Sequence, residues 1–258
     1  MNDLLLHTRD ARGVVTLTLN DPARFNALGS DMLHSLQNAL DEIASDDSVR
    51  AVVLAASGKA FCAGHNLKEM AAQPALSYYQ SLFTQCSRMM FSIAKLPVPV
   101  IARVQGMATA AGCQLVAQCD LAVASDDASF ATSGIQYGLF CATPSVPLVR
   151  NMPFKQAMEM LLTGEFIDAH TAQAQGLINR AVAPDALDSQ VEQLVQSIVQ
   201  KPATAVRMGK ALLYRQREMG LEAAYVLAGE TMACNMMDAD AQEGAQAFAQ
   251  KRSPAWRG

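Results

Sequence analysis

Residues 60–70, which read A-F-C-A-G-H-N-L-K-E-M, carry the clearest indication of chemistry in this 258-residue chain. They follow an apolar, β-branched run at residues 49–56 that predicts a buried strand. Ala63 and Gly64 then lead into a segment with helix-forming character. A turn from a strand into a helix leaves backbone N–H groups unpaired at the positive end of the helix dipole. The stretch therefore predicts a turn that holds a negatively charged oxygen.

Residues 105–112 form a second turn of the same construction. The strand-like run 98–104 precedes it, and residues 113–118 predict a helix after it. Close packing between strand and helix also explains small residues at such a turn. For either turn taken alone, this structural explanation stays open. Two matching turns favour a functional use.

Alternating strands and helices must position these turns. Apolar and polar side chains alternate over residues 14–20, which predicts a strand. Residues 30–44 predict a helix capped by Ser30. An amphipathic helix is expected at 76–95, ended by Pro97 and Pro99. Further strands are expected at 121–124, 129–132 and 178–182, and helices at 156–162, 169–175, 187–199, 203–218, 221–237 and 241–251. The pattern predicts an α/β core over residues 1–196 and a helical region over residues 197–258.

Composition excludes several classes of function. The length and the 51% hydrophobic content allow one large core, and the net charge of −4 gives no attraction to nucleic acid or to anionic membranes. No apolar run approaches the roughly 20 residues that span a bilayer, and the first ten residues lack the features of a signal peptide. The six cysteines form no C-x-x-C pair. We therefore expect a reduced, cytoplasmic protein without a metal site.

Residues 60–70 resemble the signature of the crotonase superfamily (the enoyl-CoA hydratases and isomerases), A-F-x-A-G-x-D-[LI]-K-E-M. Residues 20–28, N-D-P-A-R-F-N-A-L, are similar to the family's N-R-P-x-x-x-N-A-L loop. The resemblance extends from about Val14 to Trp256. It implies a spiral of ββα units and a C-terminal all-helical region that packs against the core and builds homotrimers, often paired into hexamers. It also implies an acyl-CoA as the small-molecule ligand and no separate cofactor.

In this family two backbone N–H groups bind the thioester oxygen and stabilise an enolate. The resemblance assigns them to His65 and Ala111, and any residue except proline supplies such a group. The His65 imidazole is either an acid or hydrogen-bond donor beside the reacting carbon or a side chain turned to solvent, and we favour the second alternative. Asn66 replaces the usual aspartate, and we expect it to support the turn through bonds to the backbone.

The two glutamates of the enoyl-CoA hydratases have no counterpart here. The family's G-G-G-C-E pattern reads A-A-G-C-Q and ends on Gln114, and its F-x-x-P-E-x-x-x-G pattern has Gly134 in place of the glutamate. Gln114 binds a water but cannot take its proton, and Gly134 has no side chain. Since one positioned acid or base is worth roughly 10²–10⁴ in rate, ordinary hydration should be crippled.

Other groups could supply the proton transfer. The resemblance places Tyr137, Cys141 and His65 near the acyl end of the ligand. Residues 138–144 resemble a subgroup of hydratase-domain proteins that lack both glutamates. A lone cysteine in an apolar run is more often inert filler, and we favour that interpretation for Cys141. Asp120 matches a family aspartate that we interpret as structural.

The phosphates of coenzyme A require cations at the mouth of the site. Arg24 and Lys68 lie beside the matched loops, and Lys251 occupies the position from which relatives reach the nucleotide. An isolated surface lysine is usually only solvated, but Lys68 lies inside the motif and we expect it to contact the ligand. The remaining expected ligand contacts are Phe25, Ala27, Ala63, Asn66, Leu67, Met107 and Ala110.

Three functions follow from these observations. The first is an acyl-CoA enzyme of the hydratase/isomerase type with reduced or redirected chemistry. The second is a non-catalytic acyl-CoA-binding or regulatory protein, which the missing glutamates favour. The third is a structural oligomer without a small-molecule site. We prefer the first to the second, and both to the third.

Overall fold

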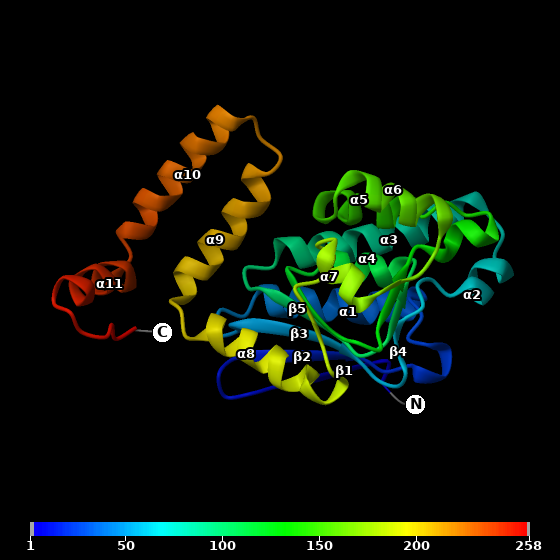
Figure 1. The fold of residues 1–258 in the computed structure, drawn as a ribbon, viewed down its shortest axis with the longest axis horizontal. Coiled ribbons are helices and arrows are strands. Elements are labelled where there is room, and N and C mark those ends of the chain that lie inside the picture. Colours follow the sequence, from blue (N-terminus) through cyan, green and yellow to red (C-terminus); the bar gives the residue numbers. More distant parts are fainter. Residues whose placement is uncertain (1–2, 257–258) are drawn as a thin grey trace.

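Two β-sheets form the centre of the computed structural model, which describes residues 3–256 (Figure 1). The larger sheet has the order β1-β2-β3-β5-β7-β10, with strands Leu5–Arg9, Val14–Leu19, Ala51–Ala56, Val100–Val104, Leu121–Ser125 and Arg180–Val182. Only the β1–β2 pair is antiparallel. The smaller sheet has the order β4-β6-β8-β9, with strands Ala60–Cys62, Met107–Thr109, Ser129–Ala131 and Ile167–Asp168.

The chain alternates between the two sheets. β3, β5 and β7 pair in the larger sheet, and β4, β6 and β8, which follow them in turn, pair in parallel in the smaller one. A helix comes next each time: α2 (Leu67–Ala72), α4 (Ala111–Gln118) and the 3-10 helix η2 (Ser133–Tyr137). This is the expected spiral of ββα units. Because β4 and β6 are parallel neighbours, the turns after them lie at the same end of the sheet.

Both faces of the larger sheet are covered because its strands are apolar on both sides. On β3, Val52 and Leu54 belong to the main core, which also receives α1 (Ser30–Ala44) and α3 (Leu76–Lys95). Val53 points to the opposite face, where α8 (Leu187–Val199) packs. The remaining core helices are α5 (Ala142–Asn151), α6 (Phe154–Thr163) and α7 (Ala169–Ala174).

The last three helices, α9 (Ala203–Gln216), α10 (Leu221–Met236) and α11 (Ala239–Ala249), form an arm. Figure 1 shows α10 and α11 extending away from the core, so the expected packing of this region on the core holds for α9 alone. Lys210 attaches α9 through a buried ion pair of 2.6 Å with Asp120. The Tyr214 hydroxyl donates to the same carboxylate at 2.9 Å. Asp120 is therefore structural, as predicted.

The structure corrects several details of the predicted elements. α5 was not expected, because its sequence contains Pro144 and Pro147. Ser30 does not cap α1, since Gly29 holds the cap position and the Ser30 hydroxyl donates to Glu69 instead. The division expected after residue 196 falls inside α8, which continues to Val199.

Candidate functional site

The first turn joins β4 to α2 through Ala63, Gly64 and His65. Asn66 caps α2, and its side-chain oxygen accepts from the backbone N–H groups of Lys68 and Glu69 at 3.2 and 3.3 Å. This confirms the role expected for Asn66. Gly64 has a φ of +89°, a conformation that residues with a Cβ rarely adopt. The glycine is therefore required by the path of the chain.

The second turn joins β6 to α4. Ala110 has φ 50° and ψ −120°, which is unusual for a residue other than glycine, and its N–H donates to the Ala131 carbonyl at 3.0 Å. Ala111 begins α4 and is 1% exposed. Its N–H belongs to the first helical turn and therefore has no acceptor within the helix. Strained backbone of this kind concentrates at functional sites.

The two turns are in contact through their backbones. A Cβ placed on Gly64 would lie 3.0 Å from the Ala111 nitrogen, 3.0 Å from the Thr109 oxygen and 2.9 Å from the Ala110 Cβ. The residue after Gly64 is His65, so the two amides expected to bind an oxygen belong to adjoining turns. The structure thus brings together the two segments that the sequence singled out.

The His65 side chain does not turn to solvent, so the alternative that we favoured is wrong. Its Nδ1 lies 3.1 Å from the Leu28 carbonyl oxygen. Its ring packs against that of Phe83 in an edge-type arrangement, with the ring centroids 5.4 Å apart. Nε2 is buried and has no hydrogen-bond partner among residues 3–256. Burial lowers the pKa of His65, and the Leu28 carbonyl and the Glu69 carboxylate oppose this shift only in part.

Gln114 lies on α4, one turn after Ala111, and is 3% exposed. Its Oε1 is buried, and no group in the described part of the chain bonds to it. An amide oxygen in this state costs free energy unless a ligand or a water bonds to it. The first turn and the helix after the second turn thus each carry a buried polar atom without a partner among residues 3–256, Nε2 of His65 and Oε1 of Gln114.

Gly134 lies directly against Cys141. A Cβ on Gly134 would be 2.8 Å from the Cys141 sulfur and 2.8 Å from the Leu139 carbonyl oxygen. The thiol therefore occupies the space into which a side chain at position 134 would extend. Cys141 is 6% exposed. Burial raises the pKa of its thiol, and a hydrogen bond from the Gly134 N–H lowers it by a smaller amount. A protonated, buried thiol agrees with the role of core filler.

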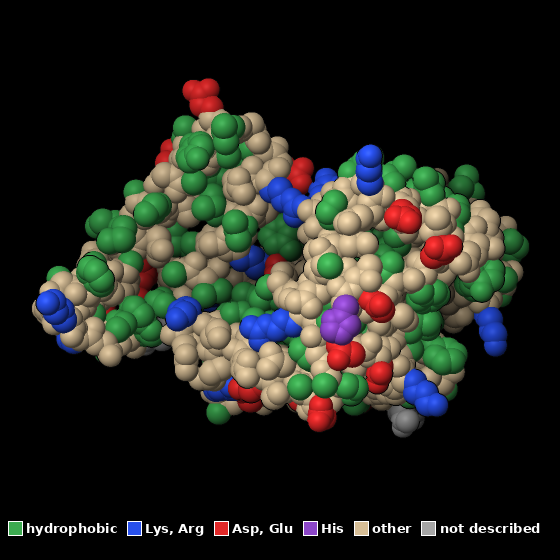
Figure 2. Space-filling view, in the orientation of Figure 1, with side chains coloured by type: hydrophobic (Ala, Val, Ile, Leu, Met, Phe, Trp, Pro, Cys, Tyr) green, Lys and Arg blue, Asp and Glu red, His purple; other side chains and the backbone are tan. Residues whose placement is uncertain are grey.

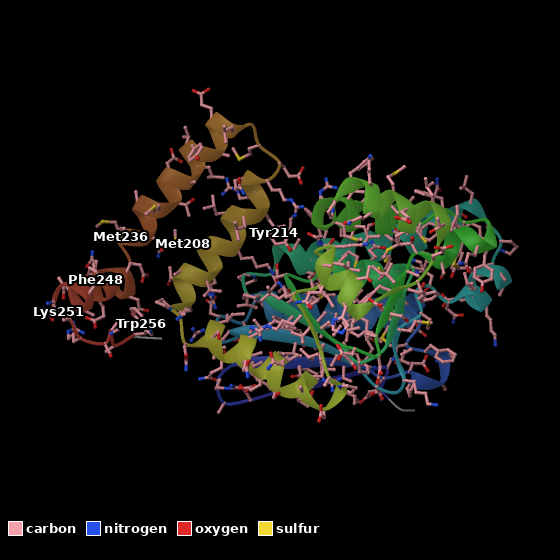
Figure 3. The ribbon with its side chains drawn as sticks, in the orientation of Figure 1. Met208, Tyr214, Met236, Phe248, Lys251 and Trp256 are labelled. Atoms are coloured by element: carbon pink, nitrogen blue, oxygen red, sulfur yellow. The ribbon has the colours of Figure 1, made fainter. Side chains whose placement is uncertain are left out.

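Tyr137, expected near the acyl end, is 76% exposed at the end of η2. Lys251 lies at the end of the arm, away from the core of this chain, so its expected contact with the nucleotide stays a prediction (Figure 3). Phe25 and Leu67 are 55% and 54% exposed beside the first turn. The other expected contacts lie near the two turns: Arg24 and Lys68 are exposed, and Ala27, Ala63 and Met107 are half-buried.

Two supporting residues were not singled out by the sequence analysis. Asn26 is fully buried, and its amide donates to the carbonyls of Ser57 and Ala60 at 2.9 Å each, which fixes the loop before the first turn. The Glu69 carboxylate accepts from the hydroxyls of Ser30 at 2.5 Å and Tyr78 at 3.0 Å. Glu69 thereby connects α1, α2 and α3 around His65. Both residues belong to the motifs matched in the sequence, but their partners come from other segments, so spacing in the sequence does not indicate these bonds.

Over residues 3–256, no three histidine, cysteine, aspartate or glutamate side chains lie close enough to hold a metal ion. Nor does any described helix combine the length and the apolar character needed to cross a membrane.

Comparison with known proteins gives concordant results. An enoyl-CoA hydratase from Mycobacterium smegmatis superimposes with a TM-score of 0.99, 61% identity and full coverage of both chains. Human enoyl-CoA hydratase domain-containing protein 3 superimposes with a TM-score of 0.95 and 41% identity, over 98% of this chain and 100% of that one. The Xenopus laevis protein of the same name is 45% identical over 95% of this chain and 83% of its own length.

That relative is described as mitochondrial, so the expected cytoplasmic location gains no support. The family model for enoyl-CoA hydratase/isomerase matches residues 9–258. With this match, the ββα spiral and the two adjoining turns, the chain belongs to the enoyl-CoA hydratase/isomerase family.

Proposed function

We propose that this protein is an acyl-CoA enzyme in which the backbone N–H groups of His65 and Ala111 bind the thioester oxygen and stabilise its enolate. The observation that carries the proposal is the contact between the two turns, in which Gly64 lies against the Ala111 nitrogen. Donors fixed by the fold need no reorganisation when charge develops on the oxygen, which makes them effective catalysts. Coenzyme A is part of the thioester substrate, and no separate cofactor is proposed.

Ordinary hydration is not the proposed reaction. At the positions that match the two glutamates, Gln114 is an amide that acts neither as an acid nor as a base near neutral pH, and Gly134 faces the protonated thiol of Cys141. The Gln114 amide is buried and its Oε1 is unpartnered, so it is suited to orient a ligand or a water. We propose this positioning role for Gln114.

The CoA portion is proposed to enter beside the first turn. Phe25 and Leu67 offer exposed apolar surface there, and Lys68 and Arg24 are exposed cations. The Arg24 guanidinium forms an ion pair with the Asp21 carboxylate at 2.6 Å. Lys68 is therefore the cation more available to bind a phosphate.

The arm supports a proposed homotrimer, with a hexamer as a further assembly. Figure 2 shows hydrophobic side chains gathered on its surface. Five of them are at least 72% exposed: Leu221, Tyr225, Met232, Met237 and Phe248. Apolar surface on this scale marks an interface between chains.

A direct test uses calorimetric titration of butyryl-CoA into the native protein, Ala111→Pro and Ala111→Gly. Proline removes the N–H and is tolerated at the first position of a helix, whereas glycine keeps the N–H. We expect Ala111→Pro to weaken binding about 3- to 10-fold, the size of one net hydrogen bond, and Ala111→Gly to bind as the native protein does. Equal binding by all three would contradict the role of this amide.

The alternative function is acyl-CoA binding without turnover, which the identity of residues 114 and 134 favours. Loss of crotonyl-CoA absorbance measures hydration, and we expect a rate at least about 10²-fold below that of an enzyme with both glutamates. A protein that binds acyl-CoA but changes no bond in it would establish the alternative. Hydration at an ordinary enzymatic rate would refute both the reduced chemistry and the alternative.

A further inference from the structure

The His65 imidazole is fixed in one tautomer by its surroundings. The Leu28 carbonyl, 3.1 Å from Nδ1, can only accept a hydrogen bond, so Nδ1 carries the hydrogen. In the neutral ring Nε2 then has a free lone pair. This atom is buried, and it has no partner within the described residues. The site therefore contains an oriented proton acceptor that the oxyanion-binding role of the His65 amide does not use.

We infer that Nε2 of His65 is the base of this site, and that it removes the α-proton of an acyl thioester whose oxygen is bound by the His65 and Ala111 amides. The inference rests on the proposed function. Amide and imidazole belong to the same residue, and the inference places the α-carbon of the bound thioester beside Nε2. The substrates are acyl-CoA thioesters with at least one α-hydrogen, and no double bond is required.

The step is balanced without a co-reactant. The α-carbon–hydrogen bond breaks, and the proton forms a new bond with Nε2. The electron pair left on the carbon forms the carbon–carbon double bond of the enolate, and the carbonyl π pair moves onto the oxygen between the two amides. Return of a proton from the imidazolium to the α-carbon restores the thioester. In D2O, exchange of the imidazolium proton with the solvent before its return replaces the α-hydrogen with deuterium.

The groups around the ring favour this role for His65. Glu69 of α2 is the charged group that faces the imidazole, and Tyr78 of α3 donates to that carboxylate at 3.0 Å. The carboxylate stabilises the imidazolium formed during the step. Burial has the larger effect and keeps the resting imidazole neutral. The other groups near the turns are poorer bases, because Gln114 is an amide and the Cys141 thiol is protonated.

The test follows the α-proton signal of butyryl-CoA by 1H NMR in D2O, with native protein, His65→Gln and His170→Gln. Glutamine at 65 keeps the backbone N–H and removes the base. His170 is an exposed histidine whose Nε2 lies 3.3 Å from the Asp126 carboxylate, which makes it a matched control. We expect exchange by the native protein and by His170→Gln, and a rate about 10²- to 10⁴-fold lower for His65→Gln, with butyryl-CoA affinity within about threefold.

Two results would overturn the inference: native protein that binds butyryl-CoA but exchanges no α-hydrogen, or His65→Gln exchanging at the native rate. Failure of the native protein to bind butyryl-CoA would instead overturn the proposed function on which it rests. A measurement on the native protein covers the case in which His65→Gln does not fold. Nitrogen-15 NMR should show the His65 hydrogen on Nδ1, and a hydrogen on Nε2 would refute the argument.

Discussion

Replacement of Gly64 by alanine tests whether the contact between the two turns creates the site. The added Cβ would meet the Ala110 Cβ at 2.9 Å and the Ala111 nitrogen and Thr109 oxygen at 3.0 Å each, all of them parts of the second turn. These distances are shorter than ordinary contacts, and two of the three atoms are backbone. The turns must therefore separate, or the chain must change its path at φ +89°.

The size of the effect follows from two contributions. Alanine at a positive φ costs about 1–2 kcal/mol, and overpacking costs about 1–3 kcal/mol. The free energy of unfolding should therefore fall by about 2–5 kcal/mol. At about 2–4 °C per kcal/mol for a chain of this size, the midpoint of thermal unfolding should fall by about 4–20 °C. Butyryl-CoA binding should weaken as well, because the two amides no longer keep their spacing.

Gly220→Ala is the matched control. A Cβ on Gly220 meets no atom within 4 Å, and its φ is −66° at the start of α10. Alanine at this N-cap position costs at most about 1 kcal/mol, so the same substitution should leave butyryl-CoA affinity native and lower the unfolding midpoint by at most about 4 °C. Calorimetry and thermal unfolding measure the two quantities. If Gly64→Ala matched Gly220→Ala in both, the reasoning from adjoining turns would be refuted.

Two further predictions concern buried groups. Lys210→Met should lower the free energy of unfolding by about 3–5 kcal/mol, because it leaves the Asp120 carboxylate buried without its cation. Adding Asp120→Asn should recover part of that loss, and chemical denaturation of both variants measures it; a double variant no more stable than the single one would contradict the pairing. Among the six thiols, Cys234 alone is exposed, and burial raises the pKa of Cys119 and of the four other buried ones. A thiol reagent at neutral pH should therefore modify Cys234 of the native chain far faster than the rest, and rapid modification of Cys141 would contradict the proposed inert thiol.

The fold was predictable wherever the signal is local. The helix predicted at residues 76–95 is observed as Leu76–Lys95, because an amphipathic pattern and the following prolines define both of its ends. β4 and β6 were not predicted as strands, since three residues are too few to show a period. The helix α5 was missed because its prolines read as breakers, although Pro144 lies in the first turn, where its missing N–H is not needed.

The features of the site were likewise predictable where they depend on neighbouring residues in the sequence, and not where they depend on tertiary contacts. Asn66 caps its own helix by accepting from the N–H groups of Lys68 and Glu69, two and three residues later, and this local role was predicted. The direction of the His65 ring was not, because it depends on Leu28 and Phe83, which approach from other elements. The contact of Gly134 with Cys141 likewise depends on the loop that brings residue 141 back. Side-chain surroundings require the tertiary structure.

Under the proposed function, chemistry can change here without loss of the two turns that are proposed to bind the oxyanion. The proposed donors are backbone N–H groups, which any residue except proline supplies at positions 65 and 111. Proton transfer uses side chains alone, and the positions that carry them can change while the backbone keeps its path. Gly134 shows one consequence, since a glutamate there would displace both the Cys141 sulfur and the Leu139 carbonyl oxygen. Restoring that glutamate therefore requires the loop before α5 to move, so Gln114→Glu alone is the informative substitution for testing whether hydration can be regained.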